Sequence, residues 1–154
     1  MTENMEKTIE HIQSVGEKLA AMRRQIRYRE VGHDSSKLKE PELHVFEEFT
    51  AKLKNSTYGS AEYNQFLKDM KPALDHHYKN NRHHPEHFLL GVSGMNLVDV
   101  LEMFCDWLAA TERHADGNIF RSIELNTERF GLSEQLADVF RNTAIDLFGK
   151  EMSE

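Results

Sequence analysis

The chain has 154 residues, enough to bury a hydrophobic core in one domain without disulfides. Its formal charge of −7 argues against binding to a nucleic-acid duplex, which generally needs a basic surface. No apolar run approaches the roughly 20 residues that cross a bilayer, and the first residues lack the pattern of a signal peptide. The single cysteine, Cys105, fits a reducing compartment. We therefore expect a cytoplasmic protein without membrane contact.

Helical periodicity runs through nearly the whole chain, which holds only three prolines and eight glycines. No alternating stretch rich in β-branched residues predicts a strand. The sequence thus predicts an all-α fold, a single helical bundle of about six helices in one domain spanning residues 1–154. The predicted helices cover about 3–29, 41–53, 60–74, 97–108, a stretch from 119, and 136–148.

Four local signals set the boundaries of these helices. Val31 and Gly32 are expected to end the first helix, and Ser60 is a candidate N-cap after a loop over residues 55–59. Pro72 predicts either a kink or a new helix start. Residues 80–94 show no clean period, and they predict a polar loop rich in histidine.

An acidic stripe follows that loop. Asp99, Glu102 and Asp106 are spaced i, i+3 and i+7, so they share one face of a helix whose other faces are apolar. Charge stripes are usually solvated, but a helix this apolar is expected to be buried, and a buried carboxylate needs a cation or several donors. We favour a functional carboxylate, with Asp106 preferred, because Asp99 lies near the helix N-terminus, where it can complement the dipole.

Histidines supply the remaining candidate ligands. His33 and Asp34 are adjacent at a junction between helices, where they could grip one divalent ion or, alternatively, cap the next helix. His11 lies beside the apolar stripe of the first helix. His44 and His114 are predicted to be surface residues. A cluster suited to binding a metal or a phosphate contains His76, His77, His83, His84 and His87.

The order of His11, His33-Asp34 and Asp106 resembles the H…HD…D signature of the HD-domain superfamily, all-helical metal-dependent phosphohydrolases whose ligands come from separate helices. The run from His33 to Lys37 is similar to the His-Asp-x-x-Lys variant of HD-GYP phosphodiesterases and of di-iron oxygenases related to myo-inositol oxygenase. It also resembles a phage and bacterial HD-like family with HDxSK and NxHH motifs, the latter at residues 81–84. Lys37 stands where the mononuclear nucleotidases have a glutamate, and no Gly-Tyr-Pro motif is present.

The resemblance implies one or two divalent metal ions, whose identity (Mn, Co, Mg, Zn, Ni or Fe) the sequence does not determine. It implies hydrolysis of a phosphate ester in a small anionic substrate such as a nucleotide. The reaction would take place in a bacterial cytoplasm or, for a phage protein, in that of the host. A homodimer is compatible with this interpretation. The metal ligands implied are His11, His33, Asp34, His77 and Asp106. We assign catalytic roles to Lys37, His84 and Glu102, and substrate contacts to Arg82 and His83.

Two alternatives stay open from the sequence. A di-iron oxygenase would use a similar mixture of histidine and aspartate, and Lys37 suits that branch equally well. A non-enzymatic phage interaction protein would keep the metal site for stability alone.

Overall fold

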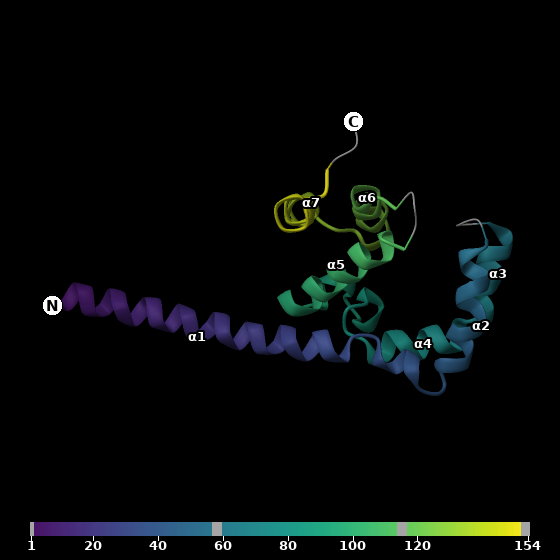
Figure 1. Ribbon diagram of the computed structural model, residues 1–154, viewed down its shortest axis with the longest axis horizontal. Helices are drawn as coiled ribbons and strands as arrows, with labels where there is room; N and C mark the ends of the chain where they lie inside the picture. The colour runs from purple at the N-terminus through teal and green to yellow at the C-terminus, as the bar shows by residue number, and fades with distance from the viewer. Residues whose placement is uncertain (1, 57–59, 114–116, 152–154) are drawn as a thin grey trace. The chain divides into compact units, whose positions relative to one another are not determined.

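The computed structural model describes residues 2–56, 60–113 and 117–151. These residues form seven α-helices and three short 3-10 helices without a strand (Figure 1), so the all-α prediction is confirmed. The chain divides into two compact units, Met1–Ser35 and Ser36–Glu154. That it acts as one domain stays a prediction. Within the described residues, no helix combines the length and the apolar character needed to cross a membrane.

The first unit is built on one continuous helix, α1 (Glu3–Gly32). Its glutamates at positions 3 and 6 complement the helix dipole at the N-terminus, and Arg29 does so at the C-terminus. The helix ends at Gly32, so the predicted break falls at the right place, but Val31 and Gly32 are themselves helical and the helix is a few residues longer than the expected 3–29. Asp34 follows with a φ of 52°, in the left-handed region, which aspartate tolerates better than most residues.

The second unit begins within the 3-10 helix η1 (Ser35–Leu38), whose first residue, Ser35, still belongs to the first unit. It continues through α2 (Leu43–Lys54), α3 (Ala61–Asp69) and α4 (Lys71–Asn80). The Ser60 side chain accepts a hydrogen bond from Tyr63 N at 3.1 Å, which confirms the predicted N-cap. Pro72 lies in the first turn of α4, where its missing N–H costs no helical bond, so it starts a new helix. Residues 57–59 of the predicted loop lie outside the described residues, as does His114.

The hydrophobic core of the second unit lies among α5 (Leu97–Thr111), α6 (Ile119–Phe130) and α7 (Glu134–Phe148), which group together in Figure 1. Phe104 of α5 and Phe140 of α7 stack with ring centroids 4.8 Å apart. Gly131, with a φ of 62°, ends α6 in a left-handed conformation that a side chain would oppose. Between α4 and α5 the predicted loop is partly ordered as two short 3-10 helices, η2 (Pro85–His87) and η3 (Gly91–Gly94).

Candidate metal centre

A fully buried carboxylate organises the polar centre of the second unit. Glu42, just before α2, has no exposed surface. Its Oε1 lies 2.7 Å from His76 Nδ1, and its Oε2 lies 2.8 Å from His77 Nδ1 and 2.9 Å from the Ser36 hydroxyl, which donates to it. Burial opposes ionisation of Glu42, but the hydrogen bonds from His76, His77 and Ser36 hold its pKa below the ordinary value. Glu42 is therefore a carboxylate at neutral pH.

The ionised Glu42 decides which nitrogen of His77 holds a proton. A carboxylate can only accept, so the Nδ1 of His77 must be the donor in their 2.8 Å contact. In the neutral ring, Nε2 then bears the lone pair. Histidines that bind a metal through one ring nitrogen usually donate the N–H of the other nitrogen to a carboxylate, which orients the ring. His77, only 1% exposed, is thus held in the tautomer and orientation that a metal ligand needs.

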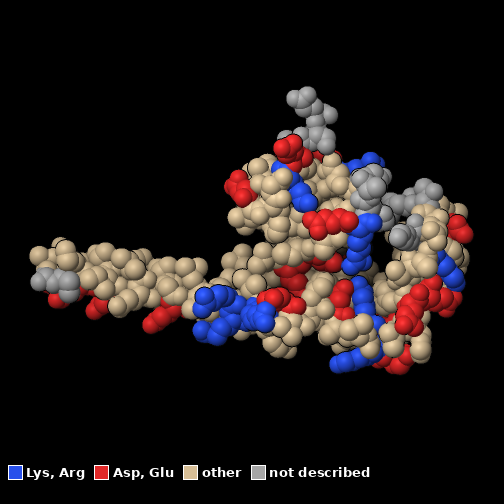
Figure 2. All heavy atoms as spheres, viewed as in Figure 1, with Lys and Arg blue, Asp and Glu red and all other residues tan. Residues whose placement is uncertain are grey.

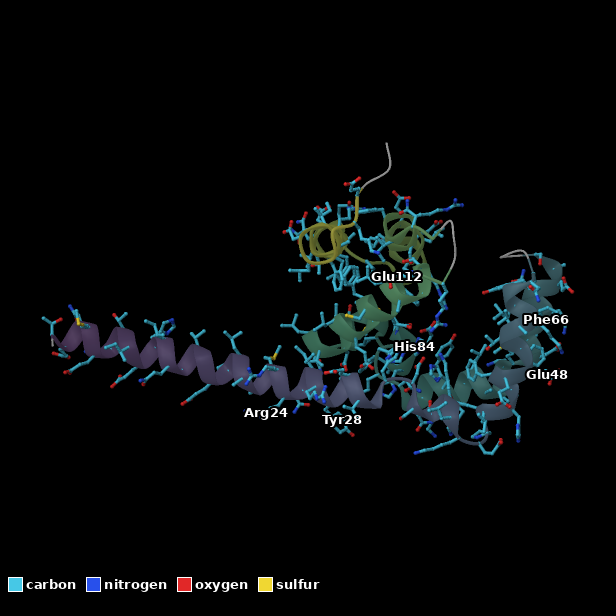
Figure 3. The ribbon with its side chains drawn as sticks, in the orientation of Figure 1. Arg24, Tyr28, Glu48, Phe66, His84 and Glu112 are labelled. Carbon is cyan, nitrogen blue, oxygen red and sulfur yellow. The ribbon has the colours of Figure 1, made fainter. Side chains whose placement is uncertain are left out.

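Two further histidines meet His77 at this point. His77 Nε2 lies 2.9 Å from Nε2 of His84, which is labelled in Figure 3 and lies in the turn after α4. His83 is also 1% exposed, and its Nδ1 lies 3.3 Å from Glu102 Oε1 on α5. Ring nitrogens of His77, His83 and His84 all lie within 4.8 Å of one another. This cluster can hold a metal ion, because nitrogen ligands about 2 Å from a common ion lie within such distances of each other.

Asn81 and Ser36 brace this cluster from its other side. Asn81 Nδ2 donates to Ser36 Oγ at 2.7 Å and to the carbonyl of His77 at 2.8 Å. Asn81 is the C-cap of α4, so the same residue ends the helix and fixes the turn that places His83 and His84. The polar network therefore links η1, the start of α2, and α4 through side chains alone.

Asp99 belongs to a separate arrangement. It has no exposed surface, and Arg82 grips it through two hydrogen bonds, Nε to Oδ1 at 3.0 Å and Nη2 to Oδ2 at 2.8 Å. Asp99 also accepts from Asn96 N, while the Asn96 side chain accepts from the amides of Val98 and Asp99, so the pair forms a capping box. The expected burial of the acidic stripe is confirmed at Asp99. The observed contacts of Asp99 start α5 and anchor Arg82.

The remaining predicted residues lie as follows. Lys37 Nζ lies 5.0 Å from the centre of the Phe46 ring. His87 Nδ1 lies 3.0 Å from the carbonyl oxygen of Tyr78, so the His87 ring lies beside α4 and not in the cluster. Asp106 is one helical turn after Glu102 on α5. In the first unit, His33 Nε2 lies 3.7 Å from Asp34 Oδ2. Asp34 stands between the end of α1 and the start of η1, a position that also suits the alternative of a cap.

His11 does not join His33 at one ion. Both belong to the same unbroken helix or its C-cap, 22 residues apart, which at 1.5 Å per residue separates them by about 33 Å. One ion cannot bind both within a single chain. The prediction of His11 as a ligand beside His33 is therefore wrong, because the helix continues through the region where a shared site would require a break.

Sequence reasoning missed Glu42, Ser36 and Asn81. Glu42 follows Pro41 at the start of a helix, where an acidic residue ordinarily serves the helix dipole in solvent, so nothing local marks it as buried. Asn81 lies in the NxHH motif and Ser36 in the HDxSK run. The joint presence of those two motifs was the available signal, since both prove to serve one network.

Comparison with known proteins places the chain in one family. The model of DUF5662, described as a family of unknown function, matches residues 1–146. Because the match spans nearly the entire chain, the protein belongs to this family. No curated protein and no solved structure was found to match it.

Proposed function

We propose that this protein is a metal-dependent phosphohydrolase that acts on a small phosphate ester, such as a nucleotide, in the cytoplasm. The observation that supports it is the cluster of His77, His83 and His84 with Glu42 behind it. The reaction type rests on the resemblance of the His33-Asp34 and Asp106 motifs to HD-domain enzymes. A divalent ion here would lower the pKa of a water molecule and offset negative charge on phosphate oxygens.

The residues of the chain itself have distinct parts in this proposal. Glu42 keeps the proton on His77 Nδ1, so Nε2 stays available as a ligand atom. Glu102, whose Oε1 lies 3.3 Å from His83 Nδ1, would support His83 in the same way. The sequence predicts that His33, Asp34 and Asp106 add to this set. Asp34 precedes Ser36 by only two residues, and Ser36 is itself part of the Glu42 network.

The anion would meet cationic side chains in this scheme. The Arg82 side chain is 42% exposed although Asp99 fixes its guanidinium plane, so an oriented positive group remains accessible. Lys37 is the second candidate for a phosphate contact. Within the cluster we assign His84 to proton transfer and not to holding the ion, since its ring lies beside His77 at the partly exposed edge of the cluster.

Metal analysis of purified variants tests the ligand set. We expect His33→Ala, Asp34→Ala and His77→Ala each to lose more than half of the bound metal, and Asp106→Asn to lose metal or activity. His11→Ala and His87→Ala are matched controls that should keep it, because one lies far along α1 and the other is bonded to Tyr78 O. Full occupancy in both His33→Ala and Asp34→Ala would reduce that doublet to a helix cap and reject the HD-type site.

Activity assays then decide the reaction. Phosphate release from a nucleotide panel, lost in His84→Ala while the metal is retained, supports hydrolysis. An iron-loaded protein that consumes oxygen and releases no phosphate would replace this proposal with the di-iron oxygenase. Loss of folding on chelation, with no turnover of any kind, would indicate a structural metal in a non-enzymatic interaction protein.

A further inference from the structure

The helix α1 has an apolar stripe that no residue of its own unit covers. None of its residues is buried, and the stripe side chains are between 37% and 65% exposed. The stripe consists of Met5, Ile9, Ile12, Val15, Leu19, Met22 and Ile26. A helix in water gains most of its stability from packing such a face against another element. A 30-residue helix with this stripe therefore calls for a partner surface of similar length.

The spacing of the stripe has a midpoint, between Val15 and Gly16. Met5 and Ile26 lie equally far from it, and so do Ile9 and Met22, and Ile12 and Leu19. When two identical helices pair about a two-fold axis in opposite directions, each residue faces its counterpart across the midpoint. In that arrangement every apolar residue of the outer stripe meets another apolar residue.

The charges of α1 select the same orientation. The half before Lys18 has Glu3, Glu6, Glu10 and Glu17 against Lys7 as its only lysine or arginine. The half from Lys18 onward has Lys18, Arg23, Arg24, Arg27 and Arg29 against Glu30 as its only acidic residue. Figure 2 shows acidic side chains toward the N-terminal end of α1 and a basic group farther along it. Antiparallel pairing sets each acidic half against a basic half, whereas parallel pairing would align like charges.

Gly16 fits this geometry at the midpoint. Glycine inside a helix costs about 1 kcal/mol relative to alanine. A Cβ built on Gly16 would have no atom within 4 Å in this chain, so nothing in the chain itself requires the glycine. In the antiparallel pair Gly16 faces Val15 of the second copy, where a missing side chain lets the two helices approach.

We propose that α1 pairs with α1 of a second copy of this chain, antiparallel and centred between Val15 and Gly16. The surface is an interaction site for self-association, and none of its stripe residues is a proposed metal ligand. Along the pair, Glu6 and Glu10 of one copy are level with the basic half of the other, and they attract it over a longer range than a contact pair would.

Sedimentation equilibrium of the full chain, with metal present, measures the association. We expect the wild type to sediment at twice 17.9 kDa. Leu19→Glu should raise the dissociation constant by roughly 100-fold or more, because the substituted residue occurs twice in the interface. Ser14→Glu, on the opposite face of the helix, should leave it unchanged. A wild-type monomer from about 1 to 100 µM, or a dimer that survives Leu19→Glu, would overturn the proposal.

Charge reversal tests the orientation. Reversing one end with Glu6→Arg and Glu10→Arg should weaken the dimer, by up to about tenfold at low ionic strength and less at high ionic strength. Adding Arg23→Glu and Arg27→Glu to the same chain should restore part of the lost affinity, because it removes the repulsion between two halves that are then both basic. A parallel pair, or α1 folded against its own chain, would show no such rescue, and either result rejects the antiparallel assignment.

Discussion

Glu42 and Asp99 are carboxylates of the same unit, both without exposed surface, and their partners give them different consequences. Asp99 is neutralised by the guanidinium of Arg82 and completes the start of α5. Glu42 is bonded instead to two imidazoles and a hydroxyl. A guanidinium has no lone pair to offer, so the first arrangement ends at Arg82. An imidazole has a second nitrogen. While Nδ1 of His77 binds Glu42, its Nε2 therefore remains directed to the cluster of His77, His83 and His84.

The comparison predicts that the Asp99–Arg82 pair contributes to the stability of the fold and not to metal binding. Asp99→Ala removes a buried partner of Arg82 and an acceptor of the capping box, and we expect the free energy of unfolding to fall by about 3 kcal/mol. Denaturant titration measures this change, and metal analysis of the folded variant should show unchanged occupancy. Glu86→Ala, which breaks an exposed pair with Arg129, is the control and should cost less than about 1 kcal/mol. Metal loss from folded Asp99→Ala would remove the distinction between the two carboxylates.

Glu42→Gln tests the other side of the comparison. The substitution keeps the size of the side chain but removes the charge that holds the proton on His77 Nδ1, so metal affinity should fall about 10- to 100-fold. Competition with a chelator of known affinity gives the value. Asp75→Asn, which alters an exposed pair with Lys71, should leave the affinity unchanged. Wild-type affinity in Glu42→Gln would show that Glu42, like Asp99, serves stability alone.

Ser36→Ala separates bracing from ligand support. The Ser36 hydroxyl donates to Glu42 and accepts from Asn81, so its removal leaves part of each polar group unsatisfied and should cost about 1 kcal/mol of unfolding free energy. We expect a smaller loss of metal affinity than in Glu42→Gln. Ser56→Ala, which removes a hydroxyl that donates to the nearby carbonyl of Leu53, is the matched control. A larger metal defect than in Glu42→Gln would assign the main orienting role to Ser36.

The lowered pKa of Glu42 predicts the pH dependence of its contribution. A carboxylate whose pKa is lower in the folded state stabilises that state above its ordinary pKa of 4.5, and the contribution is lost as pH falls through the lowered folded value. The difference in unfolding free energy between the metal-free wild type and Glu42→Gln should therefore be constant near neutrality and shrink in acid. A difference that grows as pH falls below 4.5 would contradict an ionised Glu42.

The sequence by itself determined the elements whose signals are local. The apolar periodicity of α1, the cap at Ser60 and an interruption at Pro72 depend on residues within one or two turns, so they could be predicted without the fold. Whether Pro72 kinks a helix or starts a new one stayed open. The region of the site was also visible, because histidine is dense between residues 76 and 87 and acidic spacing marks α5.

Only the tertiary structure decided which of these residues meet. Glu42 becomes the support of His76 and His77 through packing of α2 and α4, across more than thirty residues that no local pattern links. Arg82 is directed to Asp99 by the turn after α4, although its neighbours in sequence join the histidine cluster. His11 is separated from His33 because both belong to one continuous helix or its C-cap, whose rise per residue sets their distance. A motif specifies the types of residue and their order. Burial and long-range contacts are set by the packing of whole elements, and that packing also decides which residues make up a buried site.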